Sequence, residues 1–112
     1  MEKYLFYGMT GSKMCFMHIL LNALDLANDK CETKIIFEGE SVKLVSVFEE
    51  EKNPIYLKAK EQNLIAGICF ACSKALGVLE KNKEYGLPLL DDMSNHAGMK
   101  NFTKQGYHVI SM

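Results

Sequence analysis

Leu64-Ile65-Ala66-Gly67-Ile68-Cys69-Phe70-Ala71-Cys72 is the stretch of sequence that decides the fold. Its first six residues are apolar without alternation, which is typical of a parallel strand covered on both faces. The next segment, Ala71–Leu76, predicts a short helix, and Gly77 is a favourable residue just past a helix end. A buried strand therefore runs directly into a helix at Cys69, and this unit predicts an α/β protein with parallel strands.

Outward from this unit, predicted strands and helices alternate along the chain. Strands are expected over Lys3–Tyr7, Thr33–Phe37, Leu64–Cys69, Leu87–Leu90 and His108–Ser111. Helices are expected over Lys13–Asn28 (capped by Ser12), Ser41–Phe48, Pro54–Gln62, Ala71–Leu76 and about Met93–Lys104 (capped by Asp91 or Ser94). The alternation indicates an α/β fold with a mostly parallel five-stranded sheet and helices on both faces.

Length and composition limit the classes of protein that fit. The 112 residues suit one domain over 1–112, and the net charge of -1 offers no bulk attraction to nucleic acid. No apolar run approaches the ~20 residues that span a bilayer, and the first residues lack a signal-peptide layout. We expect a cytoplasmic protein without membrane or nucleic-acid partners, whose four cysteines are free thiols rather than disulfides.

The Cys-x-x-Cys pair, Cys69 and Cys72, is the sharpest chemical feature. Free amides and the helix dipole at a helix start favour a thiolate, and can lower a cysteine pKa from about 8.5 to ~3.5–7.5. Cys69 is therefore the expected nucleophile. The alternative is an inert buried thiol, since cysteine packs as a small hydrophobe. Cys72 is either a resolving thiol or core packing.

Other candidate sites carry weaker signals. A structural zinc site normally needs four ligands, and only one Cys-x-x-Cys pair is present, so we expect no metal and no cofactor. Cys15 is expected in the core and Cys31 near the second strand. His96 is expected on the surface, early in the last helix. The six residues from Gly8 to Lys13 lack the full phosphate-loop pattern and predict a turn with a helix cap.

Three residues are expected at the rim of a pocket beside Cys69: Gly8, Thr10 and Gly39. They follow the first two predicted strands, and ligands of parallel sheets collect at the carboxyl ends of the strands. The first predicted helix carries a wide apolar arc opposite a polar stripe that begins at His18. This breadth predicts burial against the sheet and contact with a partner subunit.

The stretch from Gly67 to Val78 resembles the hallmark of the DsrE/DsrF-like (DsrEFH) family, in which a strand delivers a cysteine to a short helix that ends at a glycine. The segment from Phe37 to Leu44 and the ending from Leu87 to Ile110 are similar to further family units, so the likeness covers nearly the whole chain. It implies a three-layer α/β/α sandwich, commonly a homotrimer or hexamer. It also implies that the cysteine aligned with Cys69 carries sulfur as a persulfide between donor and acceptor proteins.

Two functions follow as hypotheses. In the first, the chain is a sulfur carrier (sulfurtransferase) or thiol-redox protein, with Cys69 as nucleophile and Cys72 as resolving thiol. In the second, it is a non-enzymatic homo-oligomeric module that binds a small ligand or regulates a partner. A thioredoxin-like oxidoreductase is a weaker third hypothesis, because neither proline lies where a cis-proline strand would place it.

Overall fold

A computed structural model describes the whole chain, residues 1–112. The strands are β1 (Lys3–Gly8), β2 (Glu32–Phe37), β3 (Ile65–Cys69), β4 (Leu89–Leu90) and β5 (His108–Ser111). The helices are α1 (Lys13–Asn28), α2 (Leu44–Glu50), α3 (Pro54–Glu61), α4 (Phe70–Ala75), α5 (Leu79–Asn82) and α6 (Lys100–Thr103), with 3-10 turns η1 (Gly39–Lys43) and η2 (Lys83–Tyr85).

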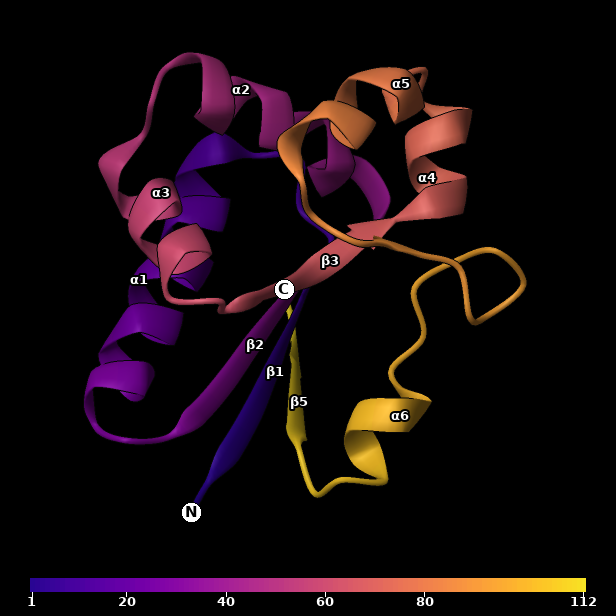
Figure 1. The fold of residues 1–112 in the computed structure, drawn as a ribbon. Coiled ribbons are helices and arrows are strands. Elements are labelled where there is room, and N and C mark those ends of the chain that lie inside the picture. The colour runs from indigo at the N-terminus through magenta and orange to yellow at the C-terminus, as the bar shows by residue number, and fades with distance from the viewer.

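All five strands pair in parallel, in the order β4-β3-β2-β1-β5. The connections from β1 to β4 run one way across the sheet, and the connection from β4 to β5 returns the other way. Because such crossovers are right-handed, α1 to α5 cover one face and α6 lies against the other, as Figure 1 shows. The predicted fold class, an α/β sandwich on a five-stranded parallel sheet, is confirmed.

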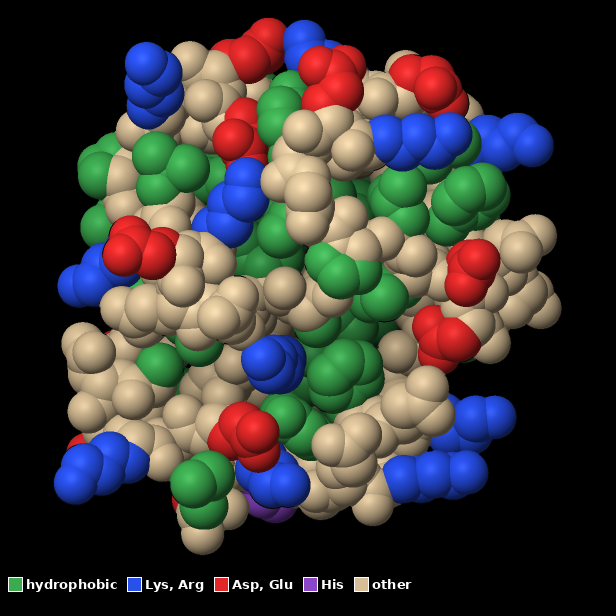
Figure 2. All heavy atoms as spheres, viewed as in Figure 1, with side chains coloured by type: hydrophobic (Ala, Val, Ile, Leu, Met, Phe, Trp, Pro, Cys, Tyr) green, Lys and Arg blue, Asp and Glu red, His purple; other side chains and the backbone are tan.

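The core lies between β1 to β3 and the helices from α1 to α3. Ile35, Ile36 and Phe37, the second half of β2, are fully buried on both faces of the sheet, which is why these three consecutive residues are apolar without alternation. Phe37 stacks on Phe16 of α1, with ring centroids 4.3 Å apart. On the face seen in Figure 2, apolar side chains gather across the middle while lysine and acidic side chains surround them.

The chain departs from the sequence prediction most clearly after β4. The expected helix over Met93–Lys104 is only α6, one turn long, because Ser94 and Asn95 both adopt positive φ (48° and 71°) and prevent a helix there. The segment between Gly77 and Gly86 forms two short helical turns, α5 and η2, which the sequence did not suggest.

The helix expected over Ser41–Phe48 is divided into the 3-10 turn η1 and α2, which begins three residues later than predicted, at Leu44. The boundaries of the other predicted elements agree with the structure to within two residues, and Ser12 caps α1 by accepting from the Cys15 amide at 3.2 Å. None of the helices combines the length and the hydropathy that crossing a bilayer requires.

Candidate functional site

Four side chains meet at the carboxyl edge of the sheet. Phe37 of β2 pairs with Ile68 of β3, so the next residues along the two strands, Glu38 and Cys69, lie side by side. Cys69 also caps α4: its Sγ accepts from the Cys72 amide at 3.3 Å. The strand–Cys–helix unit thus brings the thiol to a helix start as predicted, although α4 is only six residues long.

His96 reaches the cysteine pair from the loop between β4 and α6. Met93 and His96 exchange backbone hydrogen bonds across the two positive-φ residues of a tight turn, and the Ala71 amide of α4 donates to the Asn95 carbonyl at 2.9 Å. This anchoring places His96 Nδ1 3.3 Å from Cys69 Sγ and 3.4 Å from Cys72 Sγ. One imidazole is therefore within reach of both thiols.

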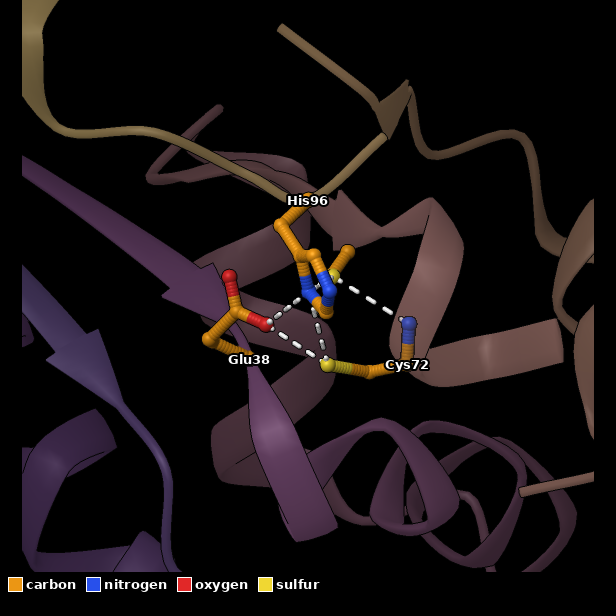
Figure 3. A group of neighbouring side chains, drawn as sticks. Glu38, Cys72 and His96 are labelled. Carbon is orange, nitrogen blue, oxygen red and sulfur yellow. Dashed lines mark hydrogen bonds and ion pairs between the residues drawn. The ribbon is translucent and has the colours of Figure 1, made fainter. Parts of the chain in front are cut away.

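Glu38 completes the group and is almost fully buried (4% exposed). Its Oε1 accepts from the Cys72 thiol at 2.7 Å and lies 3.5 Å from His96 Nδ1. Its Oε2 lies 2.8 Å from the Tyr7 hydroxyl, which is also 2.7 Å from the Ala97 carbonyl oxygen. Figure 3 shows Glu38 and Cys72 pointing toward the His96 ring from different segments of the chain.

These contacts set the charge of the site. Burial tends to raise the pKa of Glu38, but hydrogen bonds from the two thiols, Tyr7 and the Gly39 amide outweigh it and lower that pKa. Two causes raise the pKa of Cys72 to about 12: burial, which is the larger, and the hydrogen bond to Glu38. The same two causes raise the pKa of Cys69, against the lowering effect of the Cys72 amide. The resting site therefore holds an ionised carboxylate and two protonated thiols.

At Cys69 the structure favours the buried thiol, which the sequence left open as the alternative, over the expected thiolate. The side chain is fully buried (0% exposed), and the helix-start amide that was expected to lower its pKa is outweighed by burial and by the neighbouring carboxylate. Cys72, one turn further on, is half-buried and reaches the surface. The accessible sulfur of the pair is thus that of Cys72.

Two adjoining hollows open beside Cys72. The larger, of about 360 Å³, includes Cys72, His96 and Gly39 in its lining, together with the apolar side chains of Met9 and Leu76. The second, of about 320 Å³, adds Tyr7, Glu38 and Met93 to shared residues. A pocket therefore adjoins Cys72 and not Cys69 itself.

Of the three predicted rim residues, Gly39 lines both hollows, and Gly8 and Thr10 line neither. Gly8 instead acts through its backbone: its carbonyl accepts from the Ser41 hydroxyl at 2.7 Å and from the Glu38 amide at 2.9 Å. A side chain at Gly8 would lie 2.6 Å from the Phe16 ring. Thr10 accepts from the Ser12 amide in the turn before α1.

The remaining cysteines and histidines lie apart from this group. Cys15 is exposed, so the prediction that it lies in the core is wrong, and Cys31 is half-buried beside β2. His18 is exposed, as its polar stripe predicted. His108 begins β5 and faces Glu2, with Nε2 3.4 Å from Oε2.

The sequence identified the cysteine pair but not its two partners. Glu38 directly follows a buried strand, the position at which parallel sheets gather functional groups, and that position is a signal that could have pointed to it. His96 offered no such signal, because only the tight turn at Ser94 and Asn95 brings it back to α4.

Comparison with known proteins adds one relative. Over 99 residues the chain is 32% identical to the uncharacterized protein MJ0733 of Methanocaldococcus jannaschii, covering 86% of this chain and 78% of that protein. The chain belongs to the family of this archaeal protein. No established family profile matches the chain, and no solved structure matches it. Because the relative is itself uncharacterized, family membership brings no activity to this chain, and the site must be interpreted from its own geometry.

Proposed function

We propose that this chain is a DsrE/DsrF-like sulfur carrier of the cytoplasm that works through the Cys69–Cys72 pair. The observation that carries the proposal is the position of His96 Nδ1, 3.3 and 3.4 Å from the two sulfurs. A cysteine within hydrogen-bond reach of an imidazole is the general arrangement of an activated thiol, and such contacts are often loose before substrate binds. Histidine also takes up and releases protons near neutral pH.

The first step is assigned to Cys72, because this sulfur faces the hollow. As Cys72 Sγ attacks the outer sulfur of a donor persulfide, its proton passes to His96 Nδ1, the donor S–S bond breaks, and the donor leaves as a thiolate. His96 then returns the proton to that leaving group. The balance is one thiol plus one persulfide giving the Cys72 persulfide plus the donor thiol, with no outside oxidant.

The second step uses buried Cys69, whose Sγ lies within 4.8 Å of Cys72 Sγ. Cys69 attacks the inner sulfur of the Cys72 persulfide, which gives a Cys69–Cys72 disulfide and releases hydrogen sulfide. Two thiols are oxidised and one sulfur atom is reduced, so an external thiol must reduce the disulfide before the next cycle. Where an acceptor thiol attacks the outer sulfur instead, the cysteine pair stays reduced.

The surroundings of Cys72 support a protein as sulfur donor or acceptor. Met9, Leu76 and Met93 lie beside the hollows and are between about a third and a half exposed. Exposed apolar side chains around a reactive group favour contact with a partner surface. Self-assembly into a trimer or hexamer is a separate proposal, supported by Met14 and Leu21 of α1, which are 72% and 48% exposed on one face of the helix.

Mass spectrometry of the intact protein tests the sulfur carrier. The chelated, reduced protein is incubated with a small persulfide donor, and we expect a gain of one sulfur atom that is lost in Cys72→Ser. The matched control, Cys15→Ser with Cys31→Ser, should load like the unaltered chain because neither residue contacts the site. No loading in any form, or loading that survives Cys69→Ser with Cys72→Ser, would overturn the proposal.

A binding module without thiol chemistry is the second candidate, favoured by the complete burial of Cys69 and by the raised pKa of both thiols. In that case the hollow beside Gly39 holds a small ligand or a partner side chain. Cys72→Ser would then keep full ligand or partner binding, whereas sulfur carriage would be abolished by the same change.

A further inference from the structure

We propose that Glu38, Cys69, Cys72 and His96 form a binding site for one divalent cation of the zinc type. The proposal does not rest on sulfur carriage, because it needs only the donor atoms and their arrangement. One carboxylate oxygen, two thiol sulfurs and one imidazole nitrogen all lie within 4.8 Å of one another. No two of these donors other than the cysteine pair are close in sequence, so the fold alone assembles the set.

The distances suit a tetrahedral ion. Zinc binds sulfur at about 2.3 Å and nitrogen or oxygen at about 2.0–2.2 Å, so donor atoms around it lie about 3.3–3.8 Å apart. Of the six pairs of donor atoms, three are 3.3, 3.4 and 3.5 Å apart, from His96 Nδ1 to Cys69 Sγ, Cys72 Sγ and Glu38 Oε1. A fourth pair, Cys72 Sγ and Glu38 Oε1, is 2.7 Å apart, a hydrogen bond that must lengthen when the thiol proton leaves. The other two pairs, from Cys69 Sγ to Cys72 Sγ and to Glu38, lie within 4.8 Å.

The donor chemistry selects the class of ion. Two thiols exclude calcium and magnesium, which prefer all-oxygen sites, and sulfur with imidazole suits zinc, or ferrous iron and cobalt in the same geometry. Binding exchanges two protons for one ion: the cation and two thiols give a metal dithiolate and two released protons. The ion also places a positive charge beside the buried Glu38 carboxylate, where two thiols and a tyrosine hydroxyl now supply only hydrogen bonds.

The ion would join three segments that are distant in sequence: the end of β2 at Glu38, the start of α4, and the loop that carries His96. That loop is otherwise held by hydrogen bonds of Asn95 and Ala97 to α4 and β1. A metal there would fasten it to the sheet and add binding free energy to folding. It would also occupy both sulfurs, so a metal-loaded pair cannot receive sulfur until the ion leaves.

Titration of the chelated, phosphine-reduced protein tests the site. Cobalt(II) should give one saturating equivalent with the visible absorption of a tetrahedral ion and a thiolate-to-cobalt band in the near ultraviolet, and zinc should displace it. In a weakly buffered solution, each zinc bound should release two protons. We expect His96→Ala to weaken zinc binding by at least about 100-fold, since even residues behind a metal ligand change affinity by 10–100-fold.

Two further variants keep the result interpretable. Serine can replace Cys69 as a helix cap, so Cys69→Ser should fold while losing the thiolate band in part; circular dichroism checks the fold. Cys15→Ser with Cys31→Ser should bind zinc unchanged. Weak uptake without saturation, binding without proton release, or binding that disappears only in the Cys15/Cys31 variant would overturn the proposal. Because sulfur loading is measured in the presence of a chelator, the sulfur-carrier proposal and the metal-site proposal can each fail without the other.

Discussion

Replacing the Glu38 carboxylate by the equally shaped amide, Glu38→Gln, is expected to make Cys72 more reactive. Burial is the main reason that the pKa of Cys72 is raised to about 12, but the hydrogen bond to Glu38 and its charge add to it. At the 2.7 Å that separates Cys72 Sγ from Glu38 Oε1, two unit charges would repel by about 6 kcal/mol at an effective dielectric constant of about 20. Cys72 is half-buried, so we discount this for solvent screening to about 1.4 kcal/mol, which is a tenfold change in thiolate population.

The assay is the rate of alkylation of Cys72 by iodoacetamide near neutral pH, in metal-free protein, followed by mass spectrometry of the peptide that contains it. Glu38→Gln should react about tenfold faster than the unaltered chain. Glu80→Gln is the matched control: this carboxylate is exposed, lines neither hollow and pairs with Lys83 at 2.9 Å, so its removal should change the rate by less than about twofold. An unchanged or slower rate in Glu38→Gln would refute the electrostatic account of the site.

Three more outcomes follow from the same structure. In metal-free protein, the rate of Cys72 alkylation should rise about tenfold per pH unit and show no plateau by pH about 10, because the pKa of Cys72 is raised. A small reference thiol plateaus about a pH unit above its own pKa, and an equally early plateau for Cys72 would contradict the prediction. Gly67→Ala should lower the free energy of unfolding in urea by about 1–3 kcal/mol, because the new Cβ would lie 2.6 Å from the Pro88 carbonyl oxygen, just before β4. Unchanged stability would show that β4 moves away from the new methyl group at no cost. Asn82→Ala should cost about 1–3 kcal/mol, since its amide donates to Val42 and Ser73 in a buried network, and a loss well under about 0.5 kcal/mol would mean that water replaces it.

Most of the fold could be predicted from the sequence because its elements are locally encoded. The apolar run that ends at Cys69 predicts a buried strand, and Ser12 predicts the start of a helix. Residues that favour strands, near both ends of the chain, predict the first and last strands. Strand order could not be derived, since it depends on which faces pack together. The prediction of a helix over Met93–Lys104 was wrong for a related reason. Its local pattern suited a helix, but Ser94 and Asn95 adopt positive φ, and the Asn95 carbonyl accepts from the Ala71 amide of α4 instead.

The candidate site could be predicted only in part. The Cys-x-x-Cys pair and its place at a helix start were visible in the sequence, but the ionisation of Cys69 was not. The helix-start argument gave the wrong direction for its pKa because the thiol is buried and because the Glu38 carboxylate, 31 residues earlier in the chain, lies beside it. The argument against a metal site counted cysteine motifs, and the fold supplies the other two donors from Glu38 and His96.

A tryptic map of the protein after treatment with a persulfide donor tests the central claim most directly. Cleavage after lysine places both pair cysteines in the peptide 61–74 and leaves Cys15 and Cys31 in two other peptides. We expect the added sulfur in peptide 61–74 alone, followed by an internal disulfide in that peptide as hydrogen sulfide is released. Sulfur spread evenly over the three peptides, or absent from 61–74, would contradict the account.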